Sequence, residues 1–74
     1  MKKYGRLSGD SGVVAYQVAD EAIEVRFVDG KIYRYSHAST GVAHIERMKL
    51  LASQGRGLST YISKYVRNRY ESCR

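Results

Sequence analysis

The alternation of apolar and charged side chains is clearest at residues 23–27, where every second residue is apolar. A period of two is typical of a strand with one face buried and the other face in water. Residues 13–18 are rich in valine and predict an earlier strand, which a turn at Asp20 and Glu21 separates from residues 23–27. The side chains expected on one face of that earlier strand are Val14, Tyr16 and Val18.

The pair Asp29-Gly30 is a strong hairpin signal, and residues 31–35 predict the returning strand. A two-residue loop would place Arg34 on the apolar face. A three-residue loop at 28–30, with Gly30 in the left-handed position of a bulge, pairs Val25 with Tyr33 instead. A slip of one residue moves every side chain to the other face, so the burial pattern selects the bulged register. Its inner face is Ile23, Val25, Phe27, Tyr33 and Tyr35, and its outer face is Glu24, Arg26, Ile32 and Arg34.

A first helix is expected from Ser39 or Thr40, either of which can cap it, to about Ala52. Gly55 is expected to end this helix in the left-handed conformation. The apolar stripe recurs at the three- and four-residue spacing of a helix with one buried face. Its members are Val42, Ile45, Met48, Leu51 and Ala52.

A second helix is expected from Ser59 or Thr60 to about Ser72. The residues expected to share its outward face are Lys64, Arg67, Glu71 and Arg74, with Arg67 and Glu71 at i,i+4 spacing. The residues expected to face inward are Leu58, Tyr61, Ile62, Tyr65, Val66 and Tyr70.

These elements predict an α+β fold, in which a small antiparallel β-meander of two to three strands is followed by two helices packed on one face. The chain has 74 residues, enough for one domain, which we place at residues 13–72. Residues 1–12 combine Lys2, Lys3 and Arg6 with a stretch of glycine and small polar residues. They predict a flexible basic N-terminal arm.

The formal net charge of +6 is concentrated toward the two ends of the chain. Such a distribution indicates a polyanionic partner, RNA or DNA, contacted through its phosphate backbone. No signal peptide and no apolar stretch of about 18 residues is present, so we expect no membrane partner and a cytoplasmic location. The single cysteine, Cys73, excludes an intramolecular disulfide.

From Ser11 to Tyr70 the chain resembles the KTSC domain family, a small bacterial domain also found at the C-terminus of some lysyl-tRNA synthetases. The resemblance covers about four-fifths of the chain and implies a fold and a suggestion of RNA binding. Two departures are Ser39-Thr40 in place of an expected proline, and Gly57 and Ser59 in place of an expected aromatic residue and asparagine. The matching features are Val13-Val14 and Tyr16, Ile23-x-Val25-x-Phe27-x-x-Gly30, Tyr33-Arg34-Tyr35, Ser53-Gln54-Gly55, and Ile62-x-x-Tyr65.

Basic residues on and before the second expected helix are the best functional candidates, since cations on one helix face can neutralise several phosphates. They are Arg56, Lys64, Arg67, Arg69 and Arg74, which Arg26 and Arg34 on the outer sheet face could extend. The glycines at 55 and 57 could also let backbone N–H groups cradle a phosphate. Tyr33 and Tyr35 are either core residues or a platform for stacking bases.

Catalytic and metal-binding arrangements find no support in the sequence. The serines lack a partnered histidine and aspartate, and His37 and His44 have no further ligands at a suitable spacing. We therefore expect no enzyme activity, metal or cofactor. The leading hypothesis is a small basic module that binds nucleic acid, with RNA preferred. The alternative is a protein–protein interaction or accessory module, with a homodimer as one form of it, that uses the outer sheet face or an edge strand.

Overall fold

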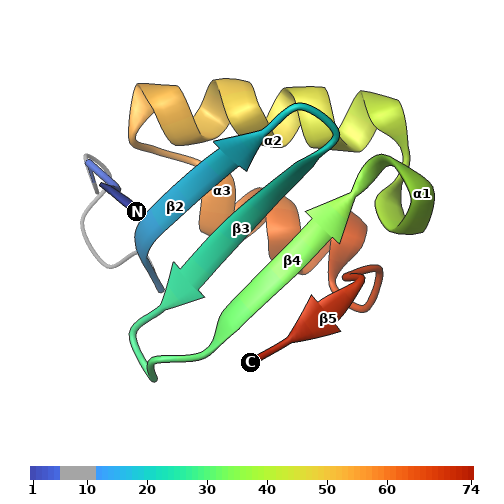
Figure 1. Cartoon of the computed structure of the whole chain (residues 1–74). Coiled ribbons are helices and arrows are strands. Elements are labelled where there is room, and N and C mark those ends of the chain that lie inside the picture. Colours follow the sequence, from blue (N-terminus) through green and yellow to red (C-terminus); the bar gives the residue numbers. More distant parts are fainter. Residues whose placement is uncertain (6–11) are drawn as a thin grey trace.

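The computed structural model describes residues 1–5 and 12–74, and within them five antiparallel strands form one sheet in the order β1-β2-β3-β4-β5. The helices cover one face of this sheet (Figure 1). The α+β class is therefore confirmed, whereas two to three strands is too low, because each end of the chain adds a short edge strand. The elements are β1 (Lys2–Lys3), β2 (Val13–Ala19), β3 (Ala22–Phe27), β4 (Ile32–Ser36), α1 (His37–Thr40), α2 (Val42–Gln54), α3 (Leu58–Tyr61), the π-helix η1 (Ile62–Val66) and β5 (Ser72–Cys73).

The hairpin of β3 and β4 has the bulged register. Val25 lies opposite Tyr33. Gly30 has φ +89°, and its N–H donates to the Phe27 carbonyl at 2.9 Å, which closes the three-residue loop. The register was predictable because this pairing puts Tyr33 and Tyr35, rather than Arg34, on the face that carries Val25 and Phe27. Tyr35 is accordingly buried on the side that the helices cover.

The face of β2 was predicted only in part, because the strand contains a bulge. Val13 pairs with Phe27 and Ala15 pairs with Arg26, so Val14 is an extra residue between them. The bulge shifts the alternation and buries Val13 as well as Tyr16.

The first helix is interrupted, and its cap lies earlier than expected. Ser36 caps α1: its Oγ accepts from the Ser39 N–H and the Ser39 Oγ accepts from the Ser36 N–H, both at 3.1 Å. Gly41, at φ +108°, then separates α1 from α2. Because α2 begins at Val42, this side chain is exposed, and its expected place in the buried apolar stripe was wrong. Gly55 ends α2 in the left-handed conformation, as expected.

The second helix ends at Val66, well before Ser72. The chain then turns, with the Arg69 N–H donating to the Val66 carbonyl at 2.8 Å, and β5 pairs with β4. The expected helical face containing Glu71 and Arg74 is therefore wrong, because both residues lie at the sheet edge. Tyr65 and Tyr70 are exposed rather than buried.

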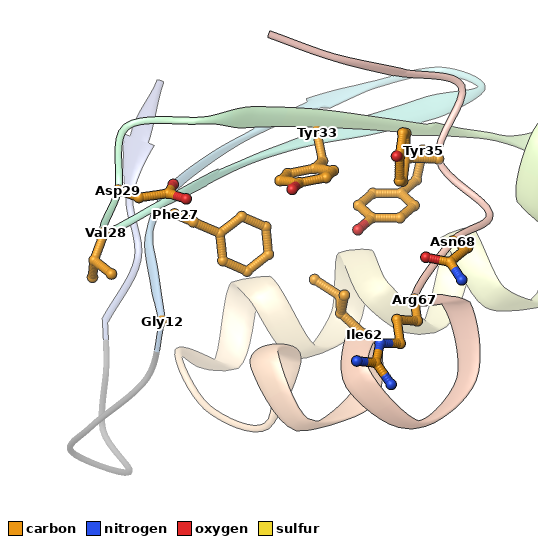
Figure 2. Close-up of a pocket in the computed structure, with 10 residues that line it drawn as sticks. Gly12, Phe27, Val28, Asp29, Tyr33, Tyr35, Ile62, Arg67 and Asn68 are labelled. Carbon is orange, nitrogen blue, oxygen red and sulfur yellow. The ribbon is translucent and has the colours of Figure 1, made fainter.

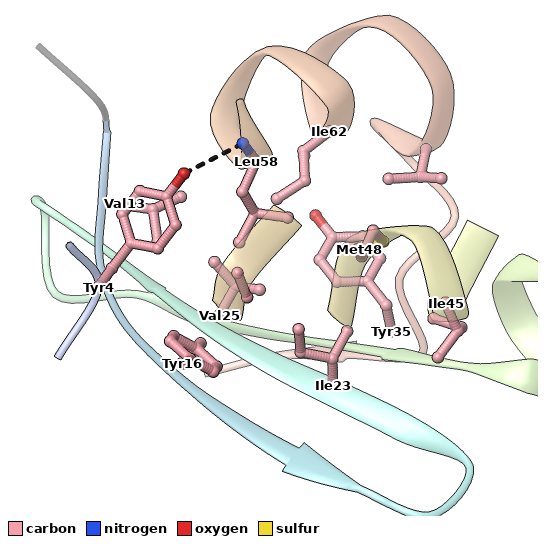
Figure 3. Close-up of a cluster of buried hydrophobic side chains, with 12 residues drawn as sticks. Tyr4, Val13, Tyr16, Ile23, Val25, Tyr35, Ile45, Met48, Leu58 and Ile62 are labelled. Atoms are coloured by element: carbon pink, nitrogen blue, oxygen red, sulfur yellow. Dashed lines mark hydrogen bonds between the residues drawn. The ribbon is translucent and has the colours of Figure 1, made fainter. Parts of the chain in front are cut away.

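Residues 1–5 take part in the fold, whereas the sequence predicted a flexible arm at residues 1–12. Lys2 lies opposite Tyr16 in the sheet, and the next residues lead Tyr4 into the core, where it is 1% exposed. The Tyr4 hydroxyl accepts a hydrogen bond from the Leu58 N–H at 3.1 Å (Figure 3). The expected arm also contains residues 6–11, which lie outside the described part of the chain. The folded unit thus reaches beyond residues 13–72 at both ends.

The core lies between the inner sheet face and the helices (Figure 3). Strands contribute valines, isoleucine and tyrosines, and the helices contribute apolar residues at three- and four-residue spacing. Its buried members are Tyr4, Val13, Tyr16, Ile23, Val25, Tyr35, Ile45, Met48, Ala52, Leu58, Ile62 and Val66. Within the described residues, no helix has the length and apolar character that a membrane span requires.

Candidate functional site

Arg34 and Arg74, two of the basic residues singled out from the sequence, are held in ion pairs on the outer sheet face. Glu24 accepts from Arg34 and from Arg74, each at 3.0 Å, and Glu71 accepts from Arg34 at 3.1 Å. Two guanidinium groups thus face two carboxylates. The turn after Val66 and the pairing of β5 with β4 bring Glu71 and Arg74 to the outer sheet face. The arginines of this part of the surface are therefore paired with carboxylates.

Arg26 is exposed on the same outer face, and no ion pair joins it to another described residue. It lies in a row across the sheet: Lys3 is opposite Ala15, Ala15 is opposite Arg26, and Arg26 is opposite Ile32. Arg74 continues the row through its two backbone hydrogen bonds with Ile32. Since helices cover the other face, this row is separated from the basic residues that follow α2.

The segment from residue 56 to residue 70 carries four basic residues and no acidic one. All four are exposed, and none forms an ion pair with a described residue. These cations, which we call the helical-side cations, are Arg56, Lys64, Arg67 and Arg69. The phosphate cradle expected at the glycines before α3 loses one donor, because the Leu58 N–H is bonded to Tyr4.

A cleft of about 410 Å³ opens between the inner sheet face and the end of η1 (Figure 2). Phe27, Tyr33 and Tyr35 project from the strands toward Ile62 and Arg67 on the helical side. We call it the aromatic cleft. Its full lining is Gly12, Phe27, Val28, Asp29, Tyr33, Tyr35, Ile62, Arg67, Asn68 and Tyr70.

The rings that line the aromatic cleft support one another. Tyr33 and Tyr35 lie nearly parallel, with an interplanar angle of 19° and centroids 6.4 Å apart. Phe27 packs edge-on against Tyr33 at 5.3 Å, and Tyr70 packs edge-on against Tyr33 at 4.9 Å. Edge-to-face contacts of this kind fix ring orientation. The two alternatives, core residue and stacking platform, therefore apply to different tyrosines. Tyr35 is a core residue, while half-buried Tyr33 and exposed Tyr70 border the opening, where a ring could stack.

The hydroxyls of Tyr33 and Tyr35 are protonated at neutral pH, because the pKa of each is raised above its ordinary value of 10.0. Burial raises the pKa of Tyr35, and the nearby Tyr33 raises it further. Hydrogen bonding to the Cys73 side chain, which lies opposite Tyr33, and electrostatic interaction with it raise the pKa of Tyr33. The hydroxyls can thus donate and accept hydrogen bonds at neutral pH.

The two histidines serve structural contacts. The His44 Nδ1 lies 2.7 Å from the Tyr61 hydroxyl, and its ring stacks near Tyr65. The His37 ring contacts Glu46 at 3.3 Å, and Lys49 contacts the same carboxylate at 3.2 Å. Hydrogen bonds from Lys49 and His37 lower the pKa of Glu46. Within residues 1–5 and 12–74, no three histidine, cysteine, aspartate or glutamate side chains gather as a metal site requires.

No family model matches this chain, and no curated protein or solved structure is significantly similar to it.

Sequence reasoning identified the helical-side cations but missed the aromatic cleft beside them. Phe27 and Tyr33 were placed on the correct face, which was one signal for it. Tyr70 was placed on a helix that ends too early to contain it, Asp29 was considered only as a hairpin residue, and Asn68 was not considered. The site is therefore a combination of charge and aromatic surface.

Proposed function

We propose that the protein is a small nucleic-acid-binding module that contacts phosphates through the helical-side cations. One observation carries the proposal. Four exposed basic residues follow one another along a segment without acidic residues, and one of them, Arg67, borders an aromatic cleft. Cations without acidic partners can exchange counterions for phosphates, which is the main source of non-specific affinity for nucleic acid.

Ion pairing decides which face we assign to the partner. Arg34 and Arg74 would have to leave Glu24 before they could hold a phosphate, and the carboxylates beside them repel a polyanion. Arg56, Lys64 and Arg67 have no such competitor among the described residues. The resemblance to KTSC domains adds the suggestion that the natural nucleic acid is RNA.

Pairing through an edge strand has less support. The edges of the sheet are β1 and β5, each two residues long. Short edge strands are one of the means by which proteins prevent pairing with other chains. A protein partner therefore remains the alternative only if nucleic acid does not bind.

The test is fluorescence anisotropy with short single-stranded and duplex oligonucleotides, at KCl concentrations between about 50 and 200 mM. About three neutralised phosphates give a slope of log K against log salt of about −2 to −3, which weakens binding about 15- to 60-fold over this range. The triple variant Arg56→Gln, Lys64→Gln, Arg67→Gln should flatten that slope.

The matched control is Lys3→Gln, Arg26→Gln, Arg74→Gln, which removes the same charge from the row on the outer sheet face. This control should keep the wild-type slope. Absence of binding by the wild type at low salt would refute the proposed function. A slope flattened by the control rather than by the first triple variant would move the interface to the sheet.

A further inference from the structure

The aromatic cleft has the size and the lining of a binding site. Its volume of about 410 Å³ lies within the usual range of ligand pockets, about 300–1,000 Å³. Half-buried Tyr33 and exposed Tyr70 border the open space, whereas the lining residues Tyr35 and Ile62 are buried. Such a space admits a planar group, which would stack on the accessible rings at the opening.

The charges at the two ends of the cleft have opposite signs. Asp29 lies at the hairpin end, while Arg67 and Asn68 lie at the end formed by the helix terminus (Figure 2). Arg67 has no ion pair with a described residue, and a guanidinium suits a phosphate because it offers several N–H donors in one plane. The Asp29 Oδ1 accepts from the Lys31 N–H at 3.0 Å. Its other oxygen can accept from the N–H groups at the edge of a base.

A nucleotide has the same order of groups, with a planar base that carries N–H donors and a phosphate at the other end. We propose that the aromatic cleft receives one unpaired nucleobase while Arg67 holds the adjoining phosphate. The inference rests on the proposed function and narrows it to single-stranded nucleic acid. Bases of a duplex are stacked on one another and cannot enter, whereas unpaired bases commonly stack on protein aromatics.

The position of Tyr70 makes the inference testable without disturbing the core. Tyr70 is 38% exposed and reaches the cleft from the segment between η1 and β5. Its edge contact with Tyr33 at 4.9 Å makes it part of the wall. Tyr65, which is 55% exposed and stacks near His44 instead, is not among the residues that line the cleft and offers a matched control.

The experiment compares two single strands with the same number of phosphates, an oligodeoxyadenylate and its abasic counterpart with tetrahydrofuran residues. Anisotropy at low salt should show that the wild type binds the base-bearing strand about 5- to 150-fold more tightly, the range expected for one stacked base. Tyr70→Ala should reduce this ratio toward one and leave the affinity for the abasic strand unchanged. Tyr65→Ala should keep the ratio.

The outcomes separate the inference from the proposed function. Equal affinity of the wild type for the two strands overturns the base site, while the phosphate interface stands. Binding to neither strand overturns both. Loss of the ratio in Tyr65→Ala instead of Tyr70→Ala would place the base near His44 and overturn the inference. The wild-type comparison needs no variant, so it decides the question even if Tyr70→Ala fails to fold.

Discussion

Replacement of Tyr4 by alanine tests whether the first residues of the chain stabilise the domain. Tyr4 is fully buried, packs edge-on against Tyr16 at 6.5 Å, and accepts the Leu58 N–H at 3.1 Å. Truncation of a large buried aromatic side chain costs about 3–5 kcal/mol. A domain of this length has a free energy of unfolding of about 4–11 kcal/mol in total, from about 0.05–0.15 kcal/mol per residue. Tyr4→Ala should therefore remove about a quarter or more of the stability.

The assay is urea unfolding followed by far-UV circular dichroism. A small domain has a slope of about 1 kcal/mol per molar urea, so a loss of 3 kcal/mol lowers the midpoint by about 3 M. Tyr4→Phe keeps the ring and removes only the hydrogen-bond acceptor. It should cost about 1–2 kcal/mol, because the Leu58 N–H is left buried without its partner.

Tyr65→Ala is the control, since it deletes the same side chain from an exposed site. It should cost no more than about 1.5 kcal/mol, the upper end for an aromatic contact. If Tyr4→Ala lowers the midpoint no more than this control does, residues 1–5 do not belong to the fold. The N-terminal arm expected from the sequence would then be restored.

Three further predictions concern the segments that position the site. Gly41→Ala should cost about 1–3 kcal/mol in urea unfolding, because φ +108° strains a residue that has a Cβ, and an unchanged midpoint would refute this conformation. Thr40→Val should cost about 1–2 kcal/mol, because it leaves the Arg69 carbonyl without the hydroxyl that donates to it at 2.7 Å, and Thr40→Ser should retain most of the stability. Glu46→Gln should lower Tm at pH 7 but not at pH 2.5. The lowered pKa of Glu46 means that its stabilising contribution is present above its ordinary value of 4.5 and is lost as the pH falls through the folded-state value, so an equal effect at both pH values would contradict the pairing.

The β3–β4 hairpin could be predicted from the sequence because one face of it is buried. That condition leaves a single register in which Ile23 and Val25 share a side with Tyr33, and Gly30 is the residue type that the bulged loop needs. The bulge at Val14 could not be predicted in the same way. It is one inserted residue, and only the partner strand shows where the insertion lies.

The two ends of the chain could not be assigned from periodicity. Lys2–Lys3 and Ser72–Cys73 are two-residue strands, too short for any repeat of apolar positions. Their positions depend on long-range backbone pairing. The outer edges of β2 and β4 have unpaired N–H and C=O groups, so the N-terminal strand pairs with β2 and the C-terminal strand pairs with β4. Tyr4 and Tyr70 then anchor the neighbouring residues, one in the core and one on the rings of β4. Helical spacing at the C-terminus predicted the wrong element because Tyr70 fits a helix stripe equally well.

The turn that follows η1 explains how the aromatic cleft forms beside Arg67 on so small a domain. The same turn after Val66 that brings Glu71 to Arg34 also carries Arg74 to Glu24, so both arginines are paired with carboxylates on the outer sheet face. A helix continued to Ser72 would have left Arg34 without the Glu71 carboxylate and Tyr33 without the Tyr70 ring. The turn therefore creates one wall of the aromatic cleft and places Tyr70 against Tyr33. The aromatic part of the candidate site depends on this one local departure from helical structure.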